Sequence, residues 1–416
     1  MIRIGIVGCG RILNAHLQGF VRLREKGIDN FRITALVARM EADARMFPIR
    51  GQGPTPRPPV LPPESGDPLA APHTYLSDFQ DDTEVQLFTD YRDMIAANLV
   101  DAVLDTTPVF LHHQIGLSAL DAGLHLLTQK PLAVSVRAGQ AMVNKASDKG
   151  LSLGVFENAR YRPIIRAIRW AFDSGLLGDR QMALLGSIGG LWSPHTVVAE
   201  TPWRHDKLLA GGGGSIDIGV HQMDVFRYVM GEVDNVHALV RTFEPERIRT
   251  NSAGEDRTSA TVDDTYFAGV TFTNKAIGQL LWSWAGHGEA LTIPGAPAFF
   301  GSRGCVQGND LILDNGQRNN ILERFERDMD SATAEKCFPM GLRDPYAILQ
   351  WEWLQGIANG GQHPETSGQE GLLDLAAAFA ILESAAVGRP VTLAEVLRGK
   401  VDVYQQEIDR HYGLLS

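Results

Sequence analysis

The chain has 416 residues, of which 44% are hydrophobic and 21% charged, and 38 Lys and Arg against 49 Asp and Glu give a net charge of −11. This composition is typical of a globular protein with a sizeable core and two or three domains, and it excludes extensive disorder. The acidic balance argues against a nucleic-acid partner, because such proteins carry a basic surface. A small anionic ligand stays possible, since backbone dipoles bind anions in acidic proteins too.

Cysteine usage and hydropathy favour the cytoplasm. The three cysteines, Cys9, Cys305 and Cys337, are widely spaced and odd in number, so we expect no disulfide. No run of 18 apolar residues is present, which predicts no membrane partner. The first residues, MIRIGIVG, enter a strand without a basic region and a separate apolar region before it, so we expect no secretory signal.

Residues 1–157 alternate strands and helices, as in a doubly wound parallel sheet. A buried strand over 2–7 leads through a glycine turn into a helix over 12–26 and a second strand over 31–38. Further strands are expected at 85–88, 101–106, 124–128 and 151–156, with helices at 91–97, 112–122 and 135–149. The pattern predicts an N-terminal domain of the Rossmann type.

A proline-dense insertion interrupts this alternation within 46–84. Nine prolines lie between Pro48 and Pro72, so no regular helix or central strand can run there. The simplest interpretation is a surface excursion with extended backbone, and a lid or an oligomer contact is the alternative.

From residue 158 the pattern changes, which predicts a second, α+β domain over 158–416. A helix over 163–174 precedes long alternating segments at 182–191, 235–242, 264–272 and 276–283, and helices follow at 345–358 and 371–387. Such segments are typical of a large open, mostly antiparallel sheet.

The turn after the first strand contains residues that can bind a phosphate-bearing ligand. In the run Gly8-Cys9-Gly10-Arg11-Ile12, Gly8 permits a tight turn and Gly10 lets backbone N–H groups approach a pyrophosphate at a helix N-terminus. We therefore predict that Gly8, Gly10, Arg11 and Ile12 bind a dinucleotide. The third glycine of the usual fingerprint is replaced by Leu13.

The end of the second strand bears on which dinucleotide binds. NAD-preferring proteins carry an acidic residue there, but this chain has Ala38-Arg39. A small residue followed by a guanidinium leaves room and charge for a 2′-phosphate, which favours NADP over NAD. Alternatively, Arg39 stacks on adenine or points to solvent.

Three further strings extend the pattern: Thr106-Thr107-Pro108 with His112, Gln129-Lys130-Pro131, and the run from Gly211 through Asp217 and His221 to Asp224. Together with the glycine turn, they resemble the Gfo/Idh/MocA family, the glucose–fructose oxidoreductase and inositol dehydrogenase type. The resemblance runs from residue 2 to about 230 and continues more weakly to the C-terminal helix. It implies a Rossmann domain, an α/β domain whose open sheet mediates homo-oligomerisation as a dimer or tetramer, and NAD(P)-dependent oxidation or reduction of a sugar, cyclitol or related polyol.

Lys130 follows a strand at the edge of the sheet where ligands bind in open α/β folds. A cationic amine there can hold a reacting oxygen or tune a neighbouring acid. Asp217 and His221 are four residues apart, so one helix face would carry both, and Asp224 continues that face. His exchanges protons near neutral pH, and a carboxylate beside it orients the ring. By resemblance, Lys130, Asp217 and His221 occupy the family's catalytic positions.

The resemblance adds residues around both ligands. On the cofactor side it implies contacts from Thr106, Thr107, Pro108, His112, Gln129, Lys130 and Asn158. Gln129 stands where the family has Glu, and its amide can still hydrogen-bond the nicotinamide ribose. On the substrate side it implies Arg160, Trp203 and Arg204 beside the catalytic residues, with packing as the alternative for Arg160 and Trp203.

No metal is expected. His112 and His113 are neighbours and diverge by about 100° on a helix, and no set of Cys, His and carboxylates with ligand spacing surrounds them. The sequence thus predicts hydride transfer in which His221 exchanges the hydroxyl proton, Asp217 orients it and Lys130 stabilises the alkoxide. The alternatives are a glycosidase that acts by transient oxidation with bound NAD and a dinucleotide-binding regulator without turnover.

Overall fold

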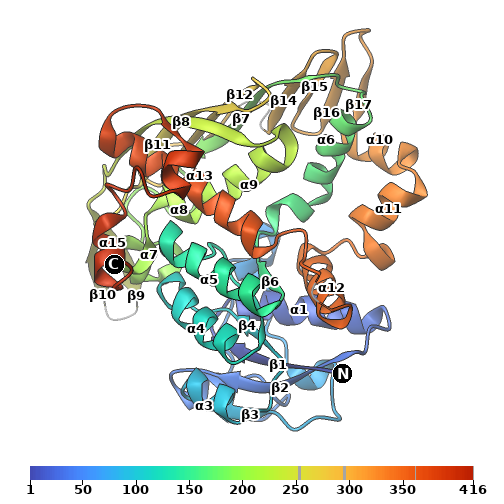
Figure 1. Cartoon of the computed structure of the whole chain (residues 1–416), viewed down its shortest axis with the longest axis vertical. Coiled ribbons are helices and arrows are strands. Elements are labelled where there is room, and N and C mark those ends of the chain that lie inside the picture. The colour runs from blue at the N-terminus through green and yellow to red at the C-terminus, as the bar shows by residue number, and fades with distance from the viewer. Residues whose placement is uncertain (252–253, 294–296, 361, 416) are drawn as a thin grey trace. The chain divides into compact units, whose positions relative to one another are not determined.

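A computed structural model describes residues 1–251, 254–293, 297–360 and 362–415 (Figure 1). The chain divides into two compact units. The first comprises residues 1–133, 139–158 and 338–371, and the second comprises residues 134–138, 159–337 and 372–416. No helix among the described residues is long and apolar enough to cross a membrane.

The first unit is built on a parallel sheet with the strand order β3-β2-β1-β4-β5-β6. Its strands are β1 (Ile2–Val7), β2 (Phe31–Val37), β3 (Gln86–Phe88), β4 (Ala102–Asp105), β5 (His125–Thr128) and β6 (Leu153–Val155). Its helices are α1 (Leu13–Glu25), α2 (Glu41–Ala44), α3 (Tyr91–Ala96), α4 (Val109–Asp121), α12 (Pro345–Ala358) and most of α5 (Val136–Lys149). The strand order reverses at β1, which lies between β2 and β4, and this is the doubly wound topology that the sequence predicts.

The strands β1, β2 and β4 are almost wholly buried, which explains their mostly apolar sequence, whereas the edge strand β3 is more exposed. They end in register, because Val7 pairs with both Val37 and Asp105, Asp105 with Thr128, and Thr128 with Val155. The residues that follow each strand therefore lie along one edge of the sheet.

Segment 338–371 belongs to the first unit, although the predicted boundary assigns everything after residue 157 to the second domain. Helix α12 lies beside α1 (Figure 1). The ring of Tyr346 lies 5.0 Å from that of His16 and 4.6 Å from that of Phe156, and Gln350 donates to the carbonyl of His16 at 3.0 Å. Aromatic packing against α1 thus draws this late segment back to the N-terminal sheet.

The described residues of the second unit form a 10-stranded sheet with the order β17-β16-β15-β14-β7-β12-β11-β8-β18, and β13 pairs with β7. The strands are β7 (Arg180–Ile188), β8 (Val233–Arg241), β11 (Thr265–Phe272), β12 (Ile277–Ser283), β13 (Leu291–Thr292), β14 (Ala298–Gly301), β15 (Gly304–Gln307), β16 (Asp310–Leu313), β17 (Arg318–Asn320) and β18 (Val391–Thr392). Only β7 and β12 pair in parallel within the described part of this sheet. The predicted fold class, a Rossmann domain followed by a mostly antiparallel open sheet, is confirmed.

The second unit also contains helices, several of which contact strands of this sheet. They include α6 (Pro163–Asp173), α7 (Lys207–Ala210), α8 (Gly214–Asp217), α9 (Gly219–Met230), α10 (Ile321–Asp328), α11 (Ser331–Cys337), α13 (Gly368–Val387, which begins in the first unit), α14 (Leu393–Leu397) and α15 (Gln406–His411). Helix α9 packs on β7 and β12, and the ring of Phe226 fills the space above Gly278. The sheet therefore fixes the helix that carries His221.

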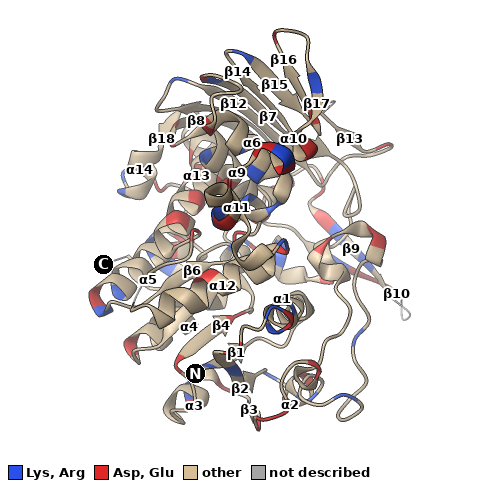
Figure 2. Cartoon of the chain, turned by 90° about the vertical axis from the view of Figure 1, so that its right-hand side faces the viewer, with Lys and Arg blue, Asp and Glu red and all other residues tan. Residues whose placement is uncertain are grey.

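A separate two-stranded ribbon, β9 (Glu246–Asn251) with β10 (Gly254–Ser259), was not predicted from the sequence. Its polar residues lack the apolar alternation of a half-buried strand. Cross-strand ion pairs join Arg249 to Asp256 at 2.7 Å and Arg257 to Glu246 at 2.8 Å, and Figure 2 shows the charged residues of this ribbon.

Candidate functional site

The glycine turn between β1 and α1 contains two glycines with different roles. Gly8 has φ +105°, and a Cβ there would lie 2.8 Å from the backbone carbon of Thr106. The fold itself therefore requires glycine at position 8. A Cβ at Gly10 would meet no atom within 4 Å, and its φ is not in the left-handed region. The chain's own packing gives no reason for glycine at position 10, whereas a ligand that approaches the backbone closely does.

The positions of the residues next to this turn fit a turn that binds a dinucleotide. Ile12 precedes the first residue of α1, so the N-terminal N–H groups of a 13-residue helix face the turn. Ala38 is buried at the end of β2, and Arg39 beside it is exposed. Thr106 is buried, and its hydroxyl donates to the carbonyl of Gly8 at 2.5 Å.

A buried aspartate that the sequence analysis missed organises the ends of β4 and β5. The Asp105 carboxylate accepts from the Thr107 backbone N–H at 3.0 Å, from the Thr107 hydroxyl at 2.6 Å and from the Thr128 hydroxyl at 3.2 Å. It therefore fixes the segments that lead to Pro108 and to Lys130. An aspartate at the last position of an otherwise apolar strand was the signal in the sequence.

His112, which lies on α4, contacts the same two segments. The residue is buried, and its ring nitrogens lie 2.9 Å from the carbonyl oxygens of Thr107 and Pro131. Both polar atoms of the ring are thus engaged by backbone. His112 supports the cofactor edge by holding its loops, and a direct cofactor contact by this residue stays a prediction.

Gln129 is buried against α1. Its Nε2 lies 2.6 Å from Nε2 of His16, and its Oε1 accepts from the Lys130 backbone N–H at 3.2 Å. Burial lowers the pKa of His16 to about 3, so this imidazole is neutral near pH 7. A neutral amide beside a neutral imidazole avoids an unpaired charge in the interior, which explains why Gln suits this position.

Lys130 and Asn158 lie at the same edge, after β5 and β6 respectively, and both are half-buried. The first unit thereby brings together the predicted cofactor residues from the ends of β1, β2, β4, β5 and β6.

The second unit positions Asp217 and His221 through the glycine run before them. The Asp263 carboxylate accepts from the backbone N–H groups of Gly213 and Ser215 and from the Ser215 hydroxyl, each at 2.8 Å. A Cβ at Gly213 would collide with the Asp263 backbone, and one at Gly211 would lie 2.7 Å from the Val134 carbonyl oxygen. The run thus lies close to its own chain, and Asp263 is a positioning residue that the sequence analysis missed.

The helix that was expected to carry Asp217 and His221 is interrupted. Asp217 ends α8, His221 lies in the first turn of α9, and Ile218 separates them with φ −107° and ψ −39°. Both side chains remain partly exposed, whereas Asp224 is fully buried. Asp224 therefore does not share the exposure of Asp217 and His221.

Asp224 belongs to a buried ion-pair cluster. It accepts from Arg160 Nε at 2.6 Å, and Arg160 also lies 3.6 Å from the Asp374 carboxylate. Arg227 binds Asp374 at 2.5 Å, and Arg166 donates to the Tyr228 hydroxyl at 2.6 Å. Only 3% of Arg160 is exposed, which favours the packing alternative for this residue over substrate contact.

Trp203 and Arg204 lie beside Asp217 on a 3₁₀ turn over Pro202–His205. The Arg204 guanidinium stacks 4.5 Å from the Trp203 ring centre and lies 3.5 Å from the Asp217 carboxylate. His205, in the same turn, is buried and accepts from the Val198 backbone N–H at 3.0 Å. Burial, helped by the charges of Arg247 and Arg204, lowers the His205 pKa to about 4. A cation that stacks on an indole therefore adjoins the carboxylate, which suits recognition of a hydroxylated ligand.

Comparison with known proteins decides the family. Residues 69–157 match the oxidoreductase family with an NAD-binding Rossmann fold, and residues 165–307 match the GFO/IDH/MocA C-terminal domain. A levoglucosan dehydrogenase of Pseudarthrobacter phenanthrenivorans is 30% identical over 275 residues, which cover 63% of this chain and 68% of that protein. This chain belongs to the GFO/IDH/MocA family. It is an oxidoreductase with an NAD-binding Rossmann fold.

Further similar proteins cover a larger share of this chain. A 1,5-anhydro-D-fructose reductase of Ensifer adhaerens is 28% identical over 304 residues, covering 72% of this chain and 82% of that protein. The structure of an oxidoreductase domain protein from Kribbella flavida superposes with a TM-score of 0.70 at 21% identity, over 94% of this chain and 99% of that one. The structure of a levoglucosan dehydrogenase with NADH and L-sorbose superposes with a TM-score of 0.68 at 21% identity, over 94% and 98%. These superpositions support the fold.

Two further features of the described residues concern the cysteines and metal binding. The three cysteines are buried free thiols. Within the ranges that the structure describes, no group of three or more His, Cys, Asp or Glu side chains could hold a metal ion.

Proposed function

We propose that this oxidoreductase transfers a hydride between the nicotinamide C4 of NAD(P) and a ring carbon of a sugar, cyclitol or related polyol. The observation that carries the proposal is the edge of the first sheet, where an open Gly10 and Lys130 follow strands that end in register. Gly10 supports a dinucleotide there because the chain's own packing does not require glycine at this position. Relatives named for levoglucosan, 1,5-anhydro-D-fructose and myo-inositol support the substrate class.

The bound nicotinamide supplies the hydride acceptor or donor. Gly8, Gly10, Arg11 and Ile12 bind the pyrophosphate half, while Ala38 and Arg39 face the adenosine ribose. Residues that follow β4, β5 and β6 contact the nicotinamide half: Thr106, Thr107, Pro108, His112, Gln129, Lys130 and Asn158.

The protein's own groups handle the proton and the oxygen. His221 takes the hydroxyl proton during oxidation and returns it during reduction, because imidazole exchanges protons near neutral pH. Asp217 orients that exchange, and Arg204, whose guanidinium lies 3.5 Å from the Asp217 carboxylate, helps to hold that carboxylate in place. Lys130 stabilises the negative charge that develops on the substrate oxygen. Trp203 and Arg204 contact the substrate.

NADP is the proposed preferred cofactor, since Arg39 is exposed at the end of β2 and no acid stands at that position. The ratio of kcat/KM for NADP to that for NAD tests this, with a ratio above one expected. A marked preference for NAD refutes the proposed role of Arg39.

A screen of sugars, inositols and glycosides with both cofactors tests the reaction. The panel includes levoglucosan, myo-inositol, D-xylose and D-apiose, which the names of relatives suggest. Stoichiometric change in the absorbance of the reduced nicotinamide is expected. Hydrolysis of a glycoside without such a change selects the glycosidase alternative instead.

We further propose a homo-oligomer, a dimer or tetramer, that forms through the uncovered face of the second unit's sheet. Leu239 of β8 pairs with Phe267 of β11, and Met182 of β7 pairs with Ile277 of β12. These side chains are 66%, 42%, 42% and 53% exposed respectively, and Figure 2 shows β7, β12 and β14 with few charged residues. Apolar residues grouped on an exposed face favour association. Light scattering on a Leu239→Lys variant is expected to give a smaller particle than the parent chain, and an unchanged mass contradicts this interface.

Free buried thiols support location in a reducing compartment, and we propose the cytoplasm.

A further inference from the structure

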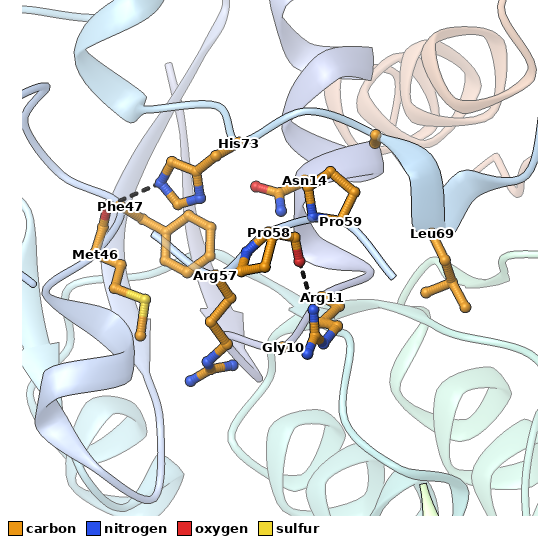
Figure 3. Close-up of a pocket in the computed structure, with 11 residues that line it drawn as sticks. Gly10, Arg11, Asn14, Met46, Phe47, Arg57, Pro58, Pro59, Leu69 and His73 are labelled. Carbon is orange, nitrogen blue, oxygen red and sulfur yellow. Dashed lines mark hydrogen bonds between the residues drawn. The ribbon is translucent and has the colours of Figure 1, made fainter. Parts of the chain in front are cut away.

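The proline-dense insertion has a defined place in the first unit. A pocket lies between the glycine turn and the insertion, with Gly10 and Arg11 on one side and Arg57, Pro58 and Pro59 on the other (Figure 3). The insertion contains short 3₁₀ turns at Pro63–Ser65, Pro68–Ala70 and Leu76–Asp78, and none of its regular elements is longer than these, as its prolines predict. The insertion nevertheless packs against other residues of the first unit.

Hydrogen bonds fix the insertion on the glycine turn and on α1. Arg11 Nη1 donates to the Pro58 carbonyl at 2.5 Å, and Gln18 donates to the Thr74 hydroxyl at 2.6 Å. Within the insertion, Leu61 and Ala70 are buried. The segment is therefore packed against the part of α1 that follows the glycine turn.

Arg57 is the insertion's cation at this pocket. It forms an ion pair with Asp43 of α2 through Nη2, and among the described residues no other nitrogen of its guanidinium makes a hydrogen bond. Burial raises the pKa of the Cys9 thiol to about 12. The charge of Asp43 also raises this pKa, whereas the charge of Arg57 lowers it. Arg57 lines the same pocket as Gly10 and Arg11, so it lies at the glycine turn.

The chemistry of this position suits a phosphate. A guanidinium is always charged and its fork of N–H groups matches phosphate oxygens, and Asp43 holds it while leaving further donors available. A half-buried arginine beside backbone N–H groups also supplies local positive charge on a chain whose net charge is −11.

We propose that the insertion forms one wall of the cofactor site and that Arg57 binds a phosphate group of the dinucleotide's adenosine half. This inference rests on the proposed function. The phosphate belongs either to the pyrophosphate, which NAD and NADP share, or to the 2′-phosphate, which NADP alone carries.

The test measures the dissociation constants of NADH and NADPH by nicotinamide fluorescence for the parent chain, Arg57→Gln and Arg50→Gln. Arg50 is the matched control because it also lies in the insertion and binds an aspartate, Asp78, at 2.8 and 3.0 Å, but it does not line the pocket. Arg57→Gln is expected to raise at least one dissociation constant by about tenfold or more, as the loss of a charge-assisted hydrogen bond does. Arg50→Gln is expected to change neither beyond about twofold, the effect of a surface ion pair.

The pattern of loss identifies the phosphate. An equal loss for both dinucleotides assigns Arg57 to the pyrophosphate, and a loss for NADPH alone assigns it to the 2′-phosphate. Wild-type affinity of Arg57→Gln for both, or an equal loss in Arg50→Gln, overturns the inference. A parent chain that binds neither dinucleotide overturns the proposed function as well.

A structural effect of the substitution is checked with Arg57→Lys, which keeps the charge and the pairing with Asp43 but loses the fork. It is expected to recover part of the affinity that Arg57→Gln loses, with thermal midpoints alike in both variants. Affinity that instead follows the thermal midpoint across the variants shows Arg57 to be only a support for the loop.

Discussion

Replacing Asp224 by Asn is expected to cost stability, whereas Asp217→Asn is expected to cost turnover. The two aspartates lie seven residues apart in one motif, and the sequence alone puts them on one helix face. In the structure, the side chains of Asp224 and Arg160 are 0% and 4% exposed and meet at 2.5 Å. Those of Asp217 and Arg204 are 19% and 21% exposed and lie 3.5 Å apart.

The magnitudes follow from burial. Removal of one partner of a buried ion pair costs about 3–5 kcal/mol because the other charge is left uncompensated. Asp374 stays 3.6 Å from Arg160 and retains part of the compensation, so we expect about 3 kcal/mol for Asp224→Asn. The more open pair of Asp217 is worth about 1 kcal/mol or less.

Urea unfolding followed by intrinsic fluorescence measures the stability, and steady-state kinetics on a substrate found by the screen measures turnover. Asp217→Asn is expected to lower kcat by about 100-fold or more while its urea midpoint stays near that of the parent chain. The reasoning is refuted if Asp224→Asn unfolds at the parent's midpoint, or if Asp217→Asn is destabilised as much as Asp224→Asn.

Two further predictions concern the glycines and the buried histidines. Gly10→Ala is expected to fold as stably as the parent and to bind cofactor more weakly, whereas Gly213→Ala is expected to lower the unfolding midpoint because its Cβ collides with backbone; equal midpoints contradict this distinction. Burial lowers the pKa of His16 to about 3 and that of His113 and His205 to about 4, below the value of about 6.5 that an unfolded chain has. The unfolded chain therefore binds more protons as the pH falls below about 6.5, and each histidine costs about 2 kcal/mol of stability by pH 5. A urea midpoint that does not fall between pH 7 and pH 5 contradicts three neutral buried imidazoles.

The N-terminal fold was predictable because its local signals agree with one another. Buried parallel strands such as Ile2–Val7 are short apolar runs, and glycine and proline mark their ends. Helix α12 was also predicted, but its place in the first unit was not, because that place depends on ring packing of Tyr346 against residues more than 180 positions earlier. The ribbon β9–β10 carries no apolar alternation, and its ion pairs form only once the strands are paired.

The candidate site shows the same limit. Gly10 and Lys130 were recognisable because chain order fixes their place at a strand end. Asp105 and Asp263 were missed because their role is to accept hydrogen bonds from backbone and hydroxyl groups that only folding brings near. The burial of Asp224 was not predictable because a spacing of seven residues says nothing about which helix face Arg160 covers.

The most direct test of the central claim is the kinetics of Lys130→Met with a substrate and cofactor that the parent chain turns over. The account predicts that kcat falls by about 100-fold to 10,000-fold, since charge stabilisation of the developing alkoxide is lost, while the dissociation constant of the cofactor stays within about threefold of the parent value. Full turnover by Lys130→Met contradicts the assignment of Lys130 to the reacting oxygen and with it the proposed catalytic group.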